Sequence, residues 1–174
     1  MPNVLMVIDM LNGFLQPGRN LYCGDHSRLI IPKVSELIDR ELSKGSGIIF
    51  ICDSHETDDL EFNMFPEHCI KGTEEASIIS ELNHFQGEII EKTRYSAFFE
   101  TELDTLLENL RPERLILAGV CTDICVMHTA ADARNRDFIV DIPIDCVSSF
   151  DKKAHDNALQ HMDNILGVNL VSVG

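Results

Sequence analysis

The segment 115–131, LILAGVCTDICVMHTAA, contains the residues best suited to chemistry. Gly119 marks the predicted end of a strand, and Thr122 is a suitable N-cap for a following helix. Cys125 then lies in the first turn, where the helix dipole lowers the pKa of a thiol and free N–H groups can hold an oxyanion. These are properties of a cysteine nucleophile, but a small apolar core residue would also satisfy the pattern.

Cys121 is the alternative nucleophile in this segment. It precedes the predicted helix, so the helix dipole acts on it less. The chain has six cysteines, which are scattered and form no CxxC pair, and no secretion signal is recognisable. We therefore expect reduced thiols and a cytoplasmic protein rather than a disulfide framework.

Ionisable side chains also follow three other predicted strands. Asp9 ends the apolar run 4–8, Asp53 ends 48–52, and Lys92 ends 88–91. An acid, a base and a thiol at separate strand ends indicate a catalytic rim, provided that these ends meet at one edge of a sheet. Lys92 taken alone is more typical of an ordinary charge at a strand end.

Apolar runs and helical periodicity predict the elements that position these groups. The predicted strands are 4–8, 48–52, 88–91, 114–120, 138–142 and 170–173. The predicted helices are 29–42, 75–82, 100–109, 122–134 and 152–165.

Alternation of strands and helices indicates parallel βαβ units. Because the strands are continuously apolar, helices should cover both faces of the sheet. We predict a single α/β domain over residues 1–174, a Rossmann-like three-layer sandwich with a six-stranded parallel sheet. Ligands of such sheets bind outside the carboxyl ends of the strands.

The charge of the chain excludes two classes of partner. Its formal net charge of −15 disfavours nucleic acid and anionic membrane surfaces. No apolar run reaches bilayer length, and residues 1–10 carry Asp9 and no basic start, so they indicate a strand rather than a signal peptide.

The loop after the second predicted strand contains metal-ligand residue types. Asp53 and His55 are two residues apart and face the same way in an extended segment, and Glu61 and His68 follow. Two carboxylates and two imidazoles suit zinc, manganese or iron. Polar loops with this composition also occur without metal.

Two other arrangements compete for this loop. Asp58 and Asp59 are neighbouring carboxylates that compete with Glu61 as the fourth ligand. Cys52 and Cys69 suggest a structural zinc site, which we disfavour because Cys52 should point to the opposite face from its strand neighbour Asp53.

Several motifs resemble those of the isochorismatase-like cysteine hydrolases, the family that includes nicotinamidases. They are CTDIC at 121–125, VIDM at 7–10 with Phe14, and EK at 91–92 with SAF at 96–98. The resemblance extends over nearly the whole chain. One departure is Gly13, where the family usually has an acidic residue.

The resemblance implies a catalytic trio of Asp9, Lys92 and Cys125. Cys125 would attack an amide carbonyl, with Asp9 as acid and base, and the backbone N–H groups of Cys121 and Cys125 would hold the oxyanion. It also implies a cis peptide bond between Val120 and Cys121. His128, three residues after Cys125 on the predicted helix, is interpreted as structural rather than as part of a Cys/His dyad.

For the metal loop, the resemblance implies that Asp53, His55, Glu61 and His68 hold a divalent ion, most simply zinc, with manganese or iron as alternatives. In nicotinamidases this metal binds the ring nitrogen of the substrate. Phe14 and Phe65 are then candidate walls for the substrate ring, or ordinary core aromatics.

The activity that the resemblance implies is hydrolysis of nicotinamide to nicotinate and ammonia, a step of NAD salvage. A small-molecule amide would be the substrate, and a homo-oligomer is a family expectation. The alternatives are another cysteine hydrolase of the family, such as an N-carbamoyl amidase, a pyrazinamidase-type enzyme or an isochorismatase, and a non-enzymatic interaction module.

Overall fold

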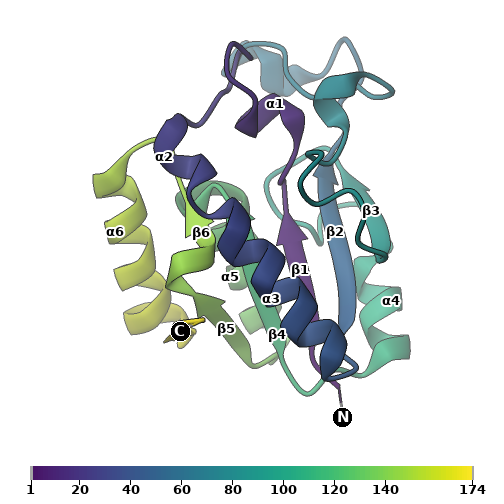
Figure 1. Cartoon of the computed structure of the whole chain (residues 1–174), viewed down its shortest axis with the longest axis vertical. Coiled ribbons are helices and arrows are strands. Elements are labelled where there is room, and N and C mark those ends of the chain that lie inside the picture. Colours follow the sequence, from purple (N-terminus) through teal and green to yellow (C-terminus); the bar gives the residue numbers. More distant parts are fainter. Residues whose placement is uncertain (1, 174) are drawn as a thin grey trace.

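A parallel sheet with helices on both faces forms the body of the molecule (Figure 1). The computed structural model describes residues 2–173. The strands are β1 (Val4–Ile8), β2 (Gly47–Asp53), β3 (Glu88–Lys92), β4 (Leu115–Val120), β5 (Val140–Pro143), β6 (Val147–Ser148) and β7 (Asn169–Val171).

Six of these strands run in the order β3-β2-β1-β4-β5-β7, and the two-residue β6 pairs with β4. The predicted α/β class with a six-stranded parallel sheet is therefore confirmed, with β6 as an addition. The chain begins in the middle of the sheet with β1, moves outward to β3 and returns to β4 on the other side. The strand order thus reverses between β1 and β4, where sheets of this kind bind ligands at the carboxyl ends.

The helices are α1 (Asn12–Leu15), α2 (Asp25–Arg28), α3 (Ile31–Ser43), α4 (Leu103–Leu110), α5 (Met127–Asn135) and α6 (Lys152–His161). Three 3-10 turns, η1 (Leu60–Asn63), η2 (Glu74–Ala76) and η4 (Ile144–Cys146), and two π-helical turns, η3 (Thr122–Val126) and η5 (Met162–Leu166), complete the described elements.

Two buried clusters, one on each face of the sheet, form the core. Leu5 and Val7 of β1 pack with α3, whereas Val4, Met6 and Ile8 pack with the buried faces of α4, α5 and α6. This division follows from the period of two in a strand, which directs successive side chains to opposite faces. α3 crosses in front of the sheet in Figure 1.

The local sequence explains the bounds of α3. Pro32 stands in its first turn, where the missing N–H costs nothing. Val34, Leu37 and Ile38 are buried at helical spacing. Gly45, with φ +80°, adopts the left-handed conformation that ends the segment.

Two helix predictions were wrong in part. The predicted helix 75–82 is absent, and only η2 forms there. The predicted helix 122–134 begins instead as the π-helical turn η3, in which the N–H of Val126 reaches the carbonyl of Cys121 at 3.2 Å, and continues as α5. Thr122 does not cap this helix; its hydroxyl is 2.7 Å from Nδ1 of His155.

Among residues 2–173, no helix combines the length and apolar character that crossing a bilayer requires.

Candidate active site and metal centre

Asp9, Lys92 and Cys125 converge at the carboxyl end of the sheet. The ammonium Nζ of Lys92 lies 3.0 Å from Oδ2 of Asp9 and 3.4 Å from Sγ of Cys125, and it also bonds Oδ1 of Asp53. All four side chains are buried. The structure thus brings the predicted trio together.

Burial and mutual charge set the protonation of this group. Burial and the neighbouring Asp53 raise the pKa of Asp9 to about 6, although Lys92 opposes the shift. Burial alone would lower the pKa of Lys92, but the carboxylates of Asp53 and Asp9 outweigh it, and the pKa rises well above its usual value. Lys92 is therefore an ammonium at neutral pH.

The expected lowering of the pKa of the Cys125 thiol is wrong. Burial raises this pKa well above 9.0, Asp9 and Asp53 add to the rise, and only Lys92 opposes it. The helix-dipole argument overlooked the cost of placing a thiolate beside two buried carboxylates. The raised pKa favours the thiol form of Cys125, and the carboxylate of Asp9, which is paired with Lys92, lies close enough to accept its proton.

The close approach of β1 and β4 positions these groups. Gly119 lies opposite Ile8 and has φ +119°, and a Cβ there would lie 2.0 Å from the carbonyl oxygen of Ile8. Only glycine fits at this point. Asp9 follows β1 with φ 51°, and its Oδ1 accepts the N–H of Asp53 at 2.9 Å. The expected cis peptide bond between Val120 and Cys121 is present.

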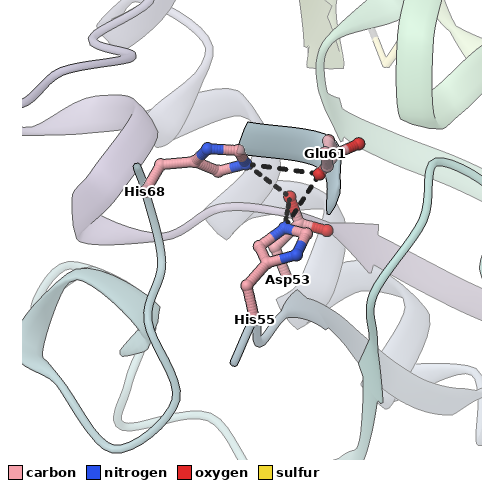
Figure 2. Close-up of side chains that lie close together, drawn as sticks. All are labelled: Asp53, His55, Glu61 and His68. Atoms are coloured by element: carbon pink, nitrogen blue, oxygen red, sulfur yellow. Dashed lines mark ion pairs between the residues drawn. The ribbon is translucent and has the colours of Figure 1, made fainter. Parts of the chain in front are cut away.

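The side chain of Asp53, at the end of β2, and those of His55, Glu61 and His68 from the loop that follows point toward one another (Figure 2). Nε2 of His55 lies 3.5 Å from Oδ2 of Asp53 and 3.1 Å from Oε2 of Glu61. Nε2 of His68 lies 3.6 Å and 3.7 Å from the same two oxygens. The predicted ligand set of Asp53, His55, Glu61 and His68 is thus assembled with one donor atom from each residue directed inward.

The hydrogen bonds that the two histidines make through Nδ1 leave a site between the four side chains that favours a cation. Nδ1 of His55 is 2.9 Å from Oδ2 of Asp59, and Nδ1 of His68 is 2.8 Å from the carbonyl of Pro66. Both partners only accept, so Nδ1 carries the proton in each ring and Nε2 presents a lone pair. Nε2 of His55 is buried without a hydrogen bond in the part of the chain described. Converging lone pairs and carboxylates need a positive charge, and their chemistry suits a divalent metal.

A proton is the other cation that this arrangement attracts. Burial alone would lower the pKa of His55, but Asp53, Asp59 and Glu61 outweigh it and raise the pKa to about 9. Metal and proton therefore compete for His55.

The alternatives for the metal loop are resolved by position. Glu61 contributes the inward carboxylate, while Asp59 contacts the outer side of His55. Cys52 packs in the core on the α3 face, away from Asp53. Cys69 is buried in the same core, and its Sγ faces the carbonyl of Glu75 at 3.6 Å, so these cysteines form no zinc site.

Residues from both sets line one pocket. Asp9, Cys121 and Cys125 lie on its wall together with Asp53, Glu61 and His68, and the predicted ring walls Phe14 and Phe65 face it as well. The remaining lining residues are Leu21, Tyr95, Val120, Ile124 and Phe150.

The sequence reasoning missed Tyr95 and Phe150, which come from loops with no recognisable spacing signal. Tyr95 follows Lys92 by three residues, and its ring centroid lies 6.5 Å from that of Phe65. His128 is exposed and points Nδ1 back to the carbonyl of Ile124 at 2.7 Å, which agrees with its interpretation as structural.

The fold and this site define a class of protein in which a buried cysteine, acid and lysine meet at the carboxyl edge of a parallel sheet, and comparison with known proteins specifies the family. The model of the isochorismatase domain matches residues 3–172. The chain belongs to the isochorismatase family.

Individual relatives cover the chain almost completely. It is 36% identical to the "uncharacterized isochorismatase family protein PncA" of Bacillus subtilis over 98% of this chain and 99% of that one. The crystal structure of nicotinamidase PncA from Bacillus subtilis superposes with a TM-score of 0.92 at 36% identity, covering 99% and 100% of the two chains. The pyrazinamidase of Pyrococcus horikoshii in complex with zinc gives a TM-score of 0.91 at 30% identity and 99% coverage of each chain.

Proposed function

We propose that this protein is a nicotinamidase, which hydrolyses nicotinamide to nicotinate and ammonia in NAD salvage. One observation carries the proposal. A single pocket is lined by the thiol of Cys125 and the carboxylate of Asp9, by three metal-ligand side chains, and by the aromatic rings of Phe14, Phe65, Tyr95 and Phe150. An aromatic amide with a ring nitrogen matches this set of groups, because the amide can meet the thiol, the ring nitrogen a metal and the ring the aromatic side chains. The likeness to the nicotinamidase of Bacillus subtilis supports the same substrate.

In the proposed reaction, Cys125 is the nucleophile and Asp9 moves the protons. Asp9 takes the thiol proton as sulfur attacks the amide carbonyl, and a pKa of about 6 suits proton exchange near neutral pH. The N–H groups of Cys121 and Cys125 hold the oxyanion. Asp9 then protonates the departing amine, leaving a thioester on Cys125.

Water completes the cycle. With ammonia gone, Asp9 is again a carboxylate and accepts a proton from water as the water attacks the thioester. The C–S bond then breaks, Asp9 returns its proton to the sulfur of Cys125, and the acid product leaves as nicotinate after losing its own proton to solvent. Lys92 remains an ammonium throughout and holds Asp9 and the sulfur within reach of each other.

Asp53, His55, Glu61 and His68 would hold the metal, whose contribution is a Lewis-acidic contact for the ring nitrogen of the substrate. Among divalent ions we propose zinc, because two imidazoles and two carboxylates suit it and a 30% identical pyrazinamidase binds it. Metal analysis of the purified protein distinguishes zinc from manganese and iron. We also propose a cytoplasmic location, which the six free cysteines support.

The test is ammonia release from nicotinamide by the metal-loaded protein. Benzamide, which has the same ring shape without the ring nitrogen, is the matched substrate control. We expect at least a tenfold preference for nicotinamide and complete loss of activity in Cys125→Ala, with Cys146→Ala as a control that alters a buried cysteine in η4. No ammonia from nicotinamide, with release from a carbamoyl amine instead, would reassign the protein to another activity of the family.

A further inference from the structure

Asp59 touches two of the four metal-ligand residues from behind. Its Oδ2 is the partner of Nδ1 of His55 at 2.9 Å, and its Oδ1 accepts the backbone N–H of Glu61 at 2.9 Å. The Asp59 side chain is only 7% exposed. One carboxylate therefore fixes both the ring of His55 and the backbone that carries Glu61.

Arg94 holds this carboxylate from the other side. Its Nη1 donates to Oδ1 of Asp59 at 2.9 Å and to Oδ2 at 3.2 Å. Arg94 belongs to the segment that follows β3 and Lys92, whereas Asp59 precedes η1 in the metal loop. The ion pair ties these two segments together.

We propose that Asp59 is the positioning residue of the metal centre, and that Arg94 acts on the centre only through Asp59. The geometry carries this inference in two ways. An ionised carboxylate only accepts hydrogen bonds, so it fixes the proton of His55 on Nδ1 and directs the Nε2 lone pair inward. The bond to the N–H of Glu61 fixes the start of the turn from which the Glu61 carboxylate reaches the same point.

Asparagine cannot replace Asp59 in both tasks. Its side chain has one acceptor oxygen, and its amide nitrogen would face a donor, either the N–H of Glu61 or Nδ1 of His55. Asp59→Asn therefore loses one of the two supports and the charge that attracts Arg94. The neighbouring Asp58 is exposed, so Asp58→Asn makes the same change of charge at a control position.

The inference rests on the metal centre of the proposed function but not on the identity of the amide substrate. Its test is the zinc affinity of the full-length metal-free protein, measured by competition with a chromophoric chelator. The absorption spectrum of the cobalt-loaded protein reports ligand geometry as a second readout. Loss of an outer partner of a metal ligand typically weakens binding about 10–100-fold.

We expect a loss of zinc affinity in this range for Asp59→Asn with an altered cobalt spectrum, and less than about a twofold change for Asp58→Asn. Arg94→Gln should weaken binding less, and the double variant should bind no more weakly than Asp59→Asn alone, because Arg94 acts through Asp59. Arg94 is partly exposed, so its variant tests the inference even if Asp59→Asn does not fold.

Two results would overturn the inference, and they differ in meaning. Wild-type zinc affinity and an unchanged cobalt spectrum in Asp59→Asn would reject the role of Asp59 alone, leaving the proposed function intact. Failure of the wild-type protein to bind zinc or cobalt would reject the role of Asp59 together with the metal part of the proposed function.

Discussion

At the scale of single residues, Lys92 is the charge on which the site depends. Its ammonium contacts the carboxylates of Asp9 and Asp53 and the sulfur of Cys125, and all are buried. Two buried carboxylates so close together need a cation between them, because an unpaired buried charge is costly.

Replacement of Lys92 by methionine should therefore destabilise the protein and abolish activity. Removing one partner of a buried ion pair costs about 3–5 kcal/mol, and we expect the free energy of unfolding to fall by this amount in urea titrations. Lys71→Met is the control, because Lys71 forms an exposed 3.7 Å pair with Glu91 and should change stability by less than about 0.5 kcal/mol. An unchanged midpoint in Lys92→Met would contradict this role.

The sequence predicted the positions of the catalytic residues better than it predicted their protonation. Asp9 and Lys92 could be predicted to lie at one edge because each directly follows a predicted strand, and parallel strands deliver such positions to the same edge. Cys125 could be predicted from its place in the first turn after the strand 114–120, and the family resemblance joined the three residues into a trio. The sign of the pKa shift of Cys125 could not, because it depends on burial beside Asp9 and Asp53. The position of Asp59 at Nδ1 of His55 could not be predicted either, since spacing does not distinguish a carboxylate that faces the metal site from one that contacts the far side of a ligand.

At the scale of elements, the contact between β1 and β4 determines whether the site forms. Gly119→Ala would force a Cβ to within 2.0 Å of the carbonyl oxygen of Ile8 at φ +119°. Gly45 also has a positive φ of +80°, but nothing lies within 4 Å of an added Cβ there. Comparing the Gly119→Ala and Gly45→Ala variants therefore separates the cost of the steric conflict from the cost of a positive φ.

We expect Gly45→Ala to cost about 1 kcal/mol, from left-handed strain alone. Gly119→Ala should cost several kcal/mol more, because backbone must move to relieve the conflict. Urea unfolding of both variants measures the difference. Equal losses of stability in the two variants would show that the strands have room to separate.

Element prediction failed where tertiary contacts replace periodicity. Residues 75–82 look helical, but Ile78 forms a bridge with Leu11, and the side chain of Asn12 donates to the carbonyl of Glu74 at 3.0 Å. These contacts with α1 and its N-cap residue hold the segment in turns. Likewise, no residue type in η3 indicates the extra residue of a π-helical turn, so the sequence predicted only a helix.

At the scale of the whole molecule, the net charge of −15 affects stability. Like charges on a compact chain repel one another, and salt screens them. We expect the thermal midpoint at pH 7 to rise by ~2–4 °C between about 10 mM and 300 mM NaCl, equivalent to about 1 kcal/mol. Near the isoelectric point of about 4.7 the rise should vanish. A midpoint that falls with salt at pH 7 would mean that attractive surface pairs outweigh repulsion.

The reaction itself is tested most directly by trapping the acyl group. Metal-loaded protein is mixed with nicotinamide, quenched with acid within the first turnover, digested and analysed by mass spectrometry. We predict a nicotinoyl thioester on the peptide that contains Cys125, and its absence in Cys125→Ala. An acyl group on Cys121, or ammonia release that survives in Cys125→Ala, would contradict the assignment of the nucleophile.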